Sequence, residues 1–258
     1  TLFRSTSRAY TDVFSEQNVH RLAGFFREFR DALLGMRGAR DGRVAILTPG
    51  PLNETYFEHA WIARYLGFSL VQGEDLTVDG GQLMVRTVSG LRPVDVLWRR
   101  LDASYSDPLE LDPASRIGTP GMVAAQRQGG LTMVNSLGSG VLETRALMAF
   151  LPKLALRMTG KPLLMHNIAT WWCGGAAERA RVQANPARLV LSSALGTGLP
   201  FDGQGESQPA ADLTPEALAQ RLAADGPSLV AQEAVTLSTT PALIDGRLVP
   251  RPMSLRVF

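Results

Sequence analysis

The chain has 258 residues, of which 45% are hydrophobic and 19% are charged, a composition typical of one large or two modest globular domains. Its net charge of +2 is too small to indicate nucleic-acid binding, and no apolar run is long enough to predict a membrane span. The single cysteine, Cys173, excludes an internal disulfide framework and a cysteine-based metal cluster, so we expect a reducing, cytoplasmic setting.

The first elements alternate between helix and strand. A helix is expected from Asn18 to about Met36, where apolar residues recur every three or four positions. A buried strand over Val44–Thr48, a helix over Tyr56–Leu66 and a short strand over Ser69–Gln72 follow. Asp79-Gly-Gly81 lies between two β-rich runs and therefore indicates a hairpin.

The alternation continues with a strand over Val94–Trp98, a short helix over Pro120–Gln128 and a strand over Leu131–Val134. This order favours an α/β fold with a mainly parallel sheet and helices on both faces. We expect this domain to cover residues 42–160, after an N-terminal helical segment at residues 1–41.

The second half is predicted to form an α+β unit at residues 161–258. A helix is expected over Glu143–Met158, and Pro152 inside it predicts a kink or break near Leu151. Further elements are a strand at Ile168–Trp172, a helix at Gly175–Asn185 and a strand at Arg188–Leu191.

Glycines punctuate the stretch from Ser192 to Asp212, which predicts either a flexible loop or a tight hairpin. Thr214 then has the pattern of a helix N-cap, because proline follows it at the first helical position. A strand at Ser228–Glu233 comes next, and Asp245-Gly246 joins two last strands. The chain begins with Thr rather than Met and stops in a strand pattern, so we expect a fragment of a longer protein.

Polar residues directly follow several strands of the first half. In an open α/β sheet, ligands bind at the carboxyl ends of the strands, so these residues form the first candidate site. Arg99 and Arg100 follow the strand at Val94–Trp98, and side chains alternate along a strand. We therefore expect one arginine to reach a site and the other to pair with a carboxylate; a structural salt bridge is the alternative.

Other candidates in this half have simpler explanations beside the functional one. Glu58 in a first helical turn is either dipole compensation or a substrate contact. His59 is more often a hydrogen-bonded structural histidine than a base. Asn135 serves either turn geometry or a substrate loop. The three histidines are spaced for neither a catalytic triad nor a metal site.

The second half contains a candidate phosphate-binding glycine pair and a cysteine. Gly196 and Gly198 would let backbone N–H groups approach phosphates, although a single Gly-x-Gly is a weak signal. Cys173 follows two tryptophans and is expected to be a core residue, because no partner histidine is indicated.

A series of short motifs resembles the circularly permuted ATP-grasp family of bacteria. The resemblance runs from about Asn18 to Phe258 and implies a domain that precedes the ATP-grasp fold, followed by an incomplete nucleotide-binding half. The motifs are, in order, Leu47-Thr-Pro-Gly-Pro51, Tyr56-Phe-Glu-His59, Gly73-Glu-Asp-Leu-Thr-Val78, Asp95-Val-Leu-Trp-Arg-Arg-Leu-Asp102, Asp107-Pro-Leu-Glu-Leu111, Asn135-Ser-Leu-Gly-Ser-Gly-Val141 and Ala169-Thr-Trp-Trp-Cys173.

The resemblance implies an ATP-dependent carboxylate–amine ligase that forms an amide or peptide bond through an acyl phosphate. It implies ATP and Mg²⁺ as cofactors, with metal ligands outside this fragment, which we expect to be inactive alone. Substrates would be small molecules or peptides, and α-helical and transglutaminase-like proteins would be partners. Neither nucleic acid nor membrane is implied.

Roles for individual residues also follow from the resemblance. It places Gln232 and Glu233 at the hinge that reads adenine through backbone hydrogen bonds. The implied catalytic residues are Arg100, Asp102 and Arg256, the substrate-binding residues are Glu58, Arg99 and Asn135, and the nucleotide-binding residues are Ser192, Gly196, Gly198, Gln232 and Glu233.

One position departs from the family pattern. The family commonly has a basic residue at a strand end where this chain has Ser192-Ser-Ala194. Loss of a point charge beside a triphosphate weakens binding, because charge-assisted hydrogen bonds are roughly twice as strong as neutral ones. Either another cation substitutes or ATP binds weakly. A non-catalytic ATP-grasp-like binding or scaffold subunit is therefore the alternative function.

Overall fold

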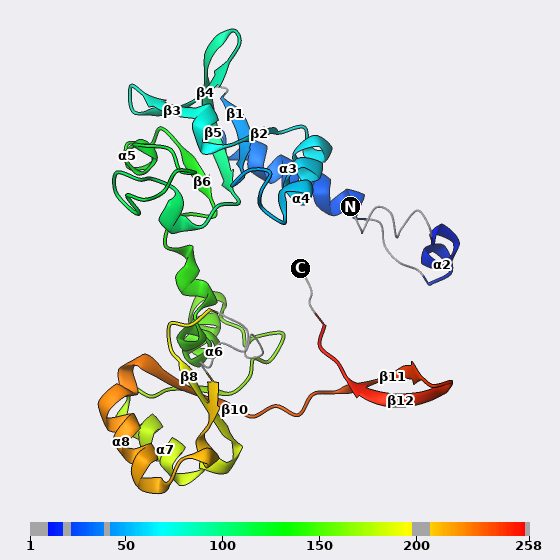
Figure 1. The fold of residues 1–258 in the computed structure, drawn as a ribbon, viewed down its shortest axis with the longest axis vertical. Coiled ribbons are helices and arrows are strands. Elements are labelled where there is room, and N and C mark those ends of the chain that lie inside the picture. Colours follow the sequence, from blue (N-terminus) through cyan, green and yellow to red (C-terminus); the bar gives the residue numbers. More distant parts are fainter. Residues whose placement is uncertain (1–9, 18–21, 39–41, 198–206, 256–258) are drawn as a thin grey trace. The chain divides into compact units, whose positions relative to one another are not determined.

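The protein forms two compact units, Thr1–Gly138 (unit 1) and Ser139–Phe258 (unit 2), in its computed structural model (Figure 1). The structure describes residues 10–17, 22–38, 42–197 and 207–255. The assignment of residues 42–160 and 161–258 to separate functional domains stays a prediction.

Unit 1 contains a mixed sheet with the strand order β2-β1-β5-β4-β3, in which β6 also pairs with β5. Strands β1, β2, β5 and β6 run parallel, whereas β3 and β4 are antiparallel additions. The predicted parallel sheet is thus confirmed, with an antiparallel extension. The bounds are β1 (Arg43–Leu47), β2 (Ser69–Val71), β3 (Leu76–Asp79), β4 (Gln82–Thr87), β5 (Gly90–Arg99) and β6 (Thr132–Val134).

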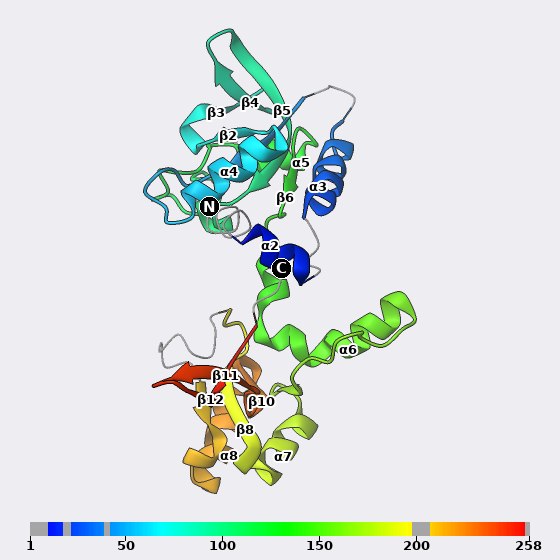
Figure 2. The same cartoon turned by 90° about the vertical axis from the view of Figure 1, so that its right-hand side faces the viewer.

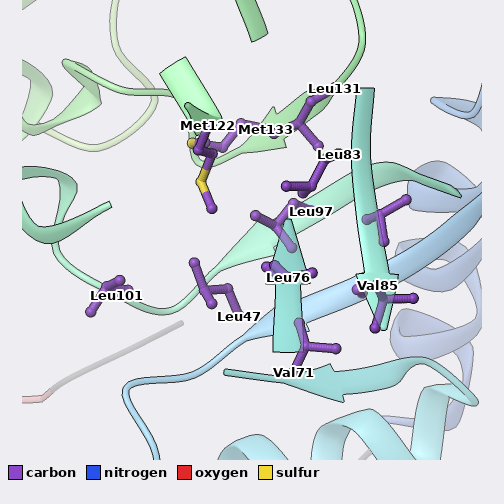
Figure 3. Packing of buried hydrophobic residues seen from close by; sticks show 12 residues of the cluster. Leu47, Val71, Leu76, Leu83, Val85, Leu97, Leu101, Met122, Leu131 and Met133 are labelled. Atoms are coloured by element: carbon purple, nitrogen blue, oxygen red, sulfur yellow. The ribbon is translucent and has the colours of Figure 1, made fainter. Parts of the chain in front are cut away.

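Helices cover both faces of this sheet, as predicted (Figures 1 and 2). Leu33 of α3 packs with Val44 and Val96 on one face. Met122 of α5 belongs to the core on the other face, where Figure 3 shows it near Met133. Neighbouring strand residues point to opposite faces, so one strand supplies both cores. The helices are α2 (Thr11–Glu16), α3 (Ala23–Gly35), α4 (Tyr56–Leu66) and α5 (Met122–Arg127).

Helix α4 is held beside α3 through the second half of its length. The ring of Phe26 lies 5.8 Å from that of Trp61 and 5.1 Å from that of Tyr65. Arg30 Nε donates to the Leu66 carbonyl at 2.9 Å. Gly67 then ends the helix with φ 74°, a left-handed conformation that favours glycine.

Two hairpins shape the antiparallel part. The predicted turn at Gly80-Gly81 is confirmed, and both residues have positive φ (55° and 78°), as a two-residue hairpin with matching twist requires. Strand β5 begins at Gly90, four residues before the predicted strand, because its first part turns back from β4 and pairs Pro93 with Met84. Proline within a run weakens the sequence signal for a strand.

A long connection, residues 101–121, joins β5 to α5 and is ordered by buried polar groups. The Asp107 carboxylate accepts hydrogen bonds from the N–H groups of Leu109 (2.9 Å), Gly121 (3.2 Å) and Val123 (2.9 Å). It therefore caps the amino end of α5. Gly118 lies so close to the backbone of Tyr105 and Ser106 that a Cβ atom would overlap it.

Unit 2 contains an antiparallel sheet with the order β7-β10-β8-β9. Helices α7 and α8 pack against one face, where Val182 and Leu222 meet Leu191 and Ala231. Thr214 caps α8 by accepting from Ala217 N at 3.2 Å, as predicted. The bounds are α6 (Arg145–Thr159), β7 (Thr170–Trp172), α7 (Ala176–Ala184), β8 (Leu189–Ser193), β9 (Ser207–Pro209), α8 (Pro215–Asp225) and β10 (Leu229–Glu233).

The last two strands, β11 (Thr239–Ile244) and β12 (Arg247–Pro252), form the predicted separate hairpin. Its turn residues Asp245 and Gly246 have φ 48° and 73°. Short 3-10 turns occur at Gly73–Asp75, Ala103–Tyr105, Ser139–Glu143, Pro186–Arg188, Ala210–Asp212 and Gly226–Ser228.

The structure refines three expectations. Helix α6 continues through Pro152, so the predicted break near Leu151 is wrong, because 15 residues leave about two turns on each side of the missing hydrogen bond. The alternative of a kink there stays a prediction. Strand β9 was not predicted; it pairs with β8, which favours the hairpin alternative for Ser192–Asp212. Ser254 and Leu255 lie in no strand.

A stability test follows from the close approach at Gly118. We expect Gly118→Ala to lower the free energy of unfolding by about 1–3 kcal/mol, because the added methyl must displace backbone atoms. Urea denaturation measures the change. Gly140→Ala is the matched control, since no atom lies within 4 Å of its Cβ position, and it should change stability by less than about 0.5 kcal/mol. Equal effects of the two substitutions would contradict the packing at Gly118.

Candidate functional site

The carboxyl edge of the parallel strands collects polar residues in unit 1. The residues directly after β1, β5 and β6 are Thr48, Arg100 and Asn135. Parallel strands end at the same edge, and two hydrogen bonds extend the pairing beyond the strands: Arg100 N donates to Leu47 O and Thr48 N to Val71 O, both at 2.9 Å. Backbone pairing therefore places these residues together.

His59, from the first turn of α4, lies at the centre of this group. Its side chain is only 2% exposed. The Nδ1 atom lies 2.9 Å from Thr48 Oγ1, while Nε2 lies 3.3 Å from Arg100 Nε and 3.1 Å from Thr55 Oγ1. One imidazole thus contacts side chains from three separate segments of the chain.

The contact with Arg100 indicates the tautomer of His59. A guanidinium only donates hydrogen bonds, so the Nε2 atom that faces Arg100 is assigned as the acceptor. The Thr55 hydroxyl donates its single proton to Asn53 Oδ1, so in this tautomer its approach to Nε2 is a contact without a hydrogen bond. The proton of the neutral ring then lies on Nδ1 and is donated to Thr48. The pKa of His59 is lowered, first by burial and then by the positive charge of Arg100, while the negative charge of Glu58 raises it. Geometry and electrostatics both favour a neutral imidazole.

The guanidinium of Arg100 is available for a ligand. Its Nε atom is used by His59, and its central carbon lies 5.6 Å from the ring centroid of Trp98. The residue is exposed, and no acceptor among the described residues contacts its two Nη groups. A planar pair of N–H donors of this kind matches a carboxylate or phosphate.

Arg99 has a different environment. Its Nε atom donates to the Asn135 carbonyl at 3.2 Å, and its Nη1 group donates to the Leu101 carbonyl. The bond to Asn135 joins the end of β5 to the end of β6, and the bond to Leu101 stays within the segment that follows β5. Asn135 therefore takes part through its backbone, and its side chain is exposed.

The two acidic candidates lie beside this group but differ in their relation to it. Glu58 is exposed in the first turn of α4 and acts on His59 through its charge. Asp102 is exposed, and its main-chain carbonyl accepts from Tyr105 N at 3.1 Å. The structure brings Arg100 and His59 into contact and leaves both carboxylates open to solvent.

In unit 2, the strand register places Ser192 and Gln232 on the same face of the sheet. Ser192 pairs with Val230, and the next pair on that face is Val190 with Gln232. Directly paired residues of antiparallel strands share a face. Helices α7 and α8 pack against the opposite face, so Ser192 and Gln232 point away from that core.

These two residues have local partners. Ser192 is buried, and its hydroxyl lies 2.9 Å from that of Ser207 on β9. The Gln232 side-chain amide donates to Thr170 Oγ1 at 3.1 Å and to Met148 Sδ at 3.5 Å.

Glu233 is on the other side of the strand. Its carboxylate accepts from Arg188 Nη2 at 3.2 Å, and its backbone N–H donates to the Ala169 carbonyl at 2.9 Å. The N–H of Ala234 donates to the Arg188 carbonyl at 2.8 Å. The backbone N–H of Glu233 in the predicted adenine hinge, and that of Ala234 directly after it, are therefore both bonded within the chain.

The glycine candidates are only partly described. The Gly196 carbonyl accepts from Arg145 N at 3.4 Å, and the Ala194 carbonyl accepts from Ala146 N at 2.8 Å, so this loop begins against the start of α6. Gly198 and Arg256 lie outside the described residues.

The sequence analysis missed Thr48 and Thr55, although each carried a signal. Thr48 directly follows a buried strand, and Thr55 precedes His59 by one helical turn. Cys173 is confirmed as a core residue: it is fully buried, and burial raises the pKa of its thiol to about 11. Within the described part of the chain, no group of three or more His, Cys, Asp or Glu residues could hold a metal, and no helix is long and apolar enough to cross a bilayer.

Comparison with known proteins identifies related sequences. A family model described as circularly permuted ATP-grasp type 2 matches residues 2–258. An uncharacterized protein of Mycobacterium tuberculosis is 36% identical over 257 residues, which are 99% of this chain and 28% of that protein. An uncharacterized Synechocystis protein is 35% identical over 218 residues, which are 83% of this chain and 44% of that protein. The chain thus spans about a quarter to a half of these relatives.

A solved structure of the ATP-grasp ligase PsnB, complexed with a minimal precursor, shows a distant likeness. It has 14% identity and a TM-score of 0.43, over 84% of this chain and 78% of that one. A likeness at this level carries no argument about residues or activity.

The neutral state of His59 predicts a pH dependence of stability. Because the folded-state pKa is lowered from the usual 6.5, the unfolded chain binds a proton more readily. The stability linked to His59 is full above about pH 6.5 and is lost as the pH falls toward the folded-state pKa. We expect the wild type to lose more unfolding free energy between pH 7.5 and 5.5 than His59→Gln, measured by urea denaturation. Parallel pH profiles for the two proteins would exclude this coupling.

Proposed function

The chain belongs to the circularly permuted ATP-grasp type 2 family, and we propose that it supplies the acceptor-substrate and nucleotide-binding parts of an ATP-dependent carboxylate–amine ligase. The family match over residues 2–258 is the observation that carries this proposal. ATP, when bound, would supply the phosphoryl group that converts a carboxylate into an acyl phosphate, with ADP as the leaving group. An amine would then attack the acyl carbon and displace phosphate, which gives an amide or peptide bond.

The face of the unit 2 sheet that carries Ser192 and Gln232 suits a nucleotide. It is opposite the face on which α7 and α8 pack, and it presents polar side chains between apolar ones. Gly196, and Gly198 outside the described residues, would bring backbone N–H groups to the phosphates. Arg256 would be a cation near the phosphates. Glu233 lies on the other side of β10, so its role on the ribose or amine side rests on the resemblance alone.

The described residues do not fit Mg²⁺. They contain no group of three His, Cys, Asp or Glu residues that could hold a metal. The Mg²⁺ ligands would therefore come from other parts of the protein.

The acceptor substrate would lie at the carboxyl edge of the unit 1 sheet. Arg100 would hold a carboxylate of the substrate, and Arg99 would fix the strand end from which it projects. Glu58 and Asp102 are open to solvent beside it, and they would orient a substrate amine together with Asn135. Such a site accelerates a reaction mainly by positioning and by electrostatic stabilisation.

The substrate class, the partner proteins and the cellular location are also proposals. The substrate would be a small molecule or peptide, the partners would be α-helical and transglutaminase-like proteins, and the setting would be cytoplasmic. Because the chain spans less than half of the relatives described above, the complete reaction would need the remaining segments.

A second function is favoured by one observation. Ser192 is buried and hydrogen-bonded to Ser207 where the family commonly has a basic residue. A chain that kept the fold and lost the charge would act as a non-catalytic binding or scaffold subunit.

Calorimetry with ATP and Mg²⁺ distinguishes the two functions. We expect weak ATP binding to the wild type, and about tenfold to a hundredfold tighter binding to Ser192→Lys, because one charge-assisted hydrogen bond contributes about 1.5–3 kcal/mol. Gln220→Lys, which adds the same charge on exposed α8, is the control and should match the wild type. If neither the wild type nor a folded Ser192→Lys protein gives binding heat at millimolar ATP, the ligase function is excluded and the scaffold function is supported.

A further inference from the structure

We propose that His59 is a positioning residue: its imidazole holds the Arg100 guanidinium so that both Nη groups face a carboxylate of the substrate. This inference rests on the proposed function only for the identity of the ligand as substrate. The contacts that carry it lie entirely within unit 1.

The imidazole is fixed by Thr48 at the nitrogen that does not face Arg100. Its Nδ1–H group donates to Thr48 Oγ1 at 2.9 Å, and Thr48 is itself held by the bond from its N–H to the Val71 carbonyl. The same hydroxyl accepts from Gly50 N at 3.3 Å. Rotation of the ring would break the bond to Thr48 within a side chain that is only 2% exposed.

Arg100 is then held at three points, one on its main chain and two on its guanidinium. Arg100 N donates to the Leu47 carbonyl at 2.9 Å, and Nε donates to His59 Nε2 at 3.3 Å. The ring of Trp98 lies below the guanidinium carbon at 5.6 Å. Because His59 uses the Nε donor, the two Nη groups are left for a bidentate contact.

A neutral acceptor is essential to this arrangement. The charged groups that act on His59 are Arg100, from the end of β5, and Glu58, from α4. The other neighbours, Thr48 after β1 and Thr55 before α4, are uncharged. A protonated imidazole would have no lone pair for Arg100 and would place two cations together.

The charges at this edge favour a carboxylate over a polyphosphate. Arg99 and Arg100 are accompanied by Glu58 and Asp102, so two positive charges are balanced by two negative ones within this group. A single negative charge on the ligand pairs with the exposed Nη groups, whereas a triphosphate would also be repelled by the two carboxylates.

The test titrates the full chain with N-acetylglycine and follows the arginine Nε–H signals by NMR, with Arg100 assigned from Arg100→Lys. His59→Leu removes the acceptor, and we expect about threefold to tenfold weaker binding, the effect of leaving one long side chain unrestrained. His59→Gln retains a neutral acceptor and should restore most of the affinity. N-acetylglycinamide, which lacks the carboxylate, is the control ligand and should not bind.

Several results would overturn the proposal. One is that a folded His59→Leu protein binds N-acetylglycine with wild-type affinity, and another is that His59→Gln binds it as weakly as His59→Leu does. The proposal also fails if the wild type does not bind N-acetylglycine, or if it binds inorganic phosphate more tightly than N-acetylglycine. If His59→Leu does not fold, ¹⁵N-histidine spectra of the wild type decide: a proton on Nδ1 supports the proposal, and a proton on Nε2 overturns it. No nucleotide is involved, so a failure of ATP binding would affect only the proposed function.

Discussion

Strand β5 is the element on which the arrangement of unit 1 depends. Its first part pairs antiparallel with β4, and its second part pairs in parallel with both β1 and β6. The three parallel strands consequently end at one edge, and the bond from Arg100 N to Leu47 O carries the alignment one residue further. Backbone pairing therefore fixes the position of the Arg100 main chain, and the contact with His59 fixes the direction of its side chain.

The two units build their polar groups by different means. In unit 1, residues from separate segments meet because parallel strands share an edge. In unit 2, the antiparallel register places Ser192 and Gln232 on one face while α7 and α8 pack on the other. The chain also replaces the expected point charge by a hydroxyl that is already bonded to Ser207. The proposal of weak nucleotide binding follows from these side chains.

Local sequence signals predicted much of the fold. The bounds of α4, the glycine turn after Asp79 and the Thr214 cap were correct, because each depends on neighbouring residues. The first part of β5 and strand β9 were not predicted, because long-range pairing outweighs a local proline. Arg100 and His59 were both noticed, but they are 41 positions apart, and only tertiary structure shows that they touch.

Hydrogen–deuterium exchange with ATP and Mg²⁺ tests the central claim, that nucleotide and acceptor substrate bind to different units. Nucleotide binding should slow exchange at β8, β10 and residues 194–197, because these segments form or border the Ser192 face. Exchange at residues 47–59 and 98–102, which carry the Arg100 group, should not change. Protection confined to unit 1, or no protection in unit 2 at saturating ATP, would contradict the account.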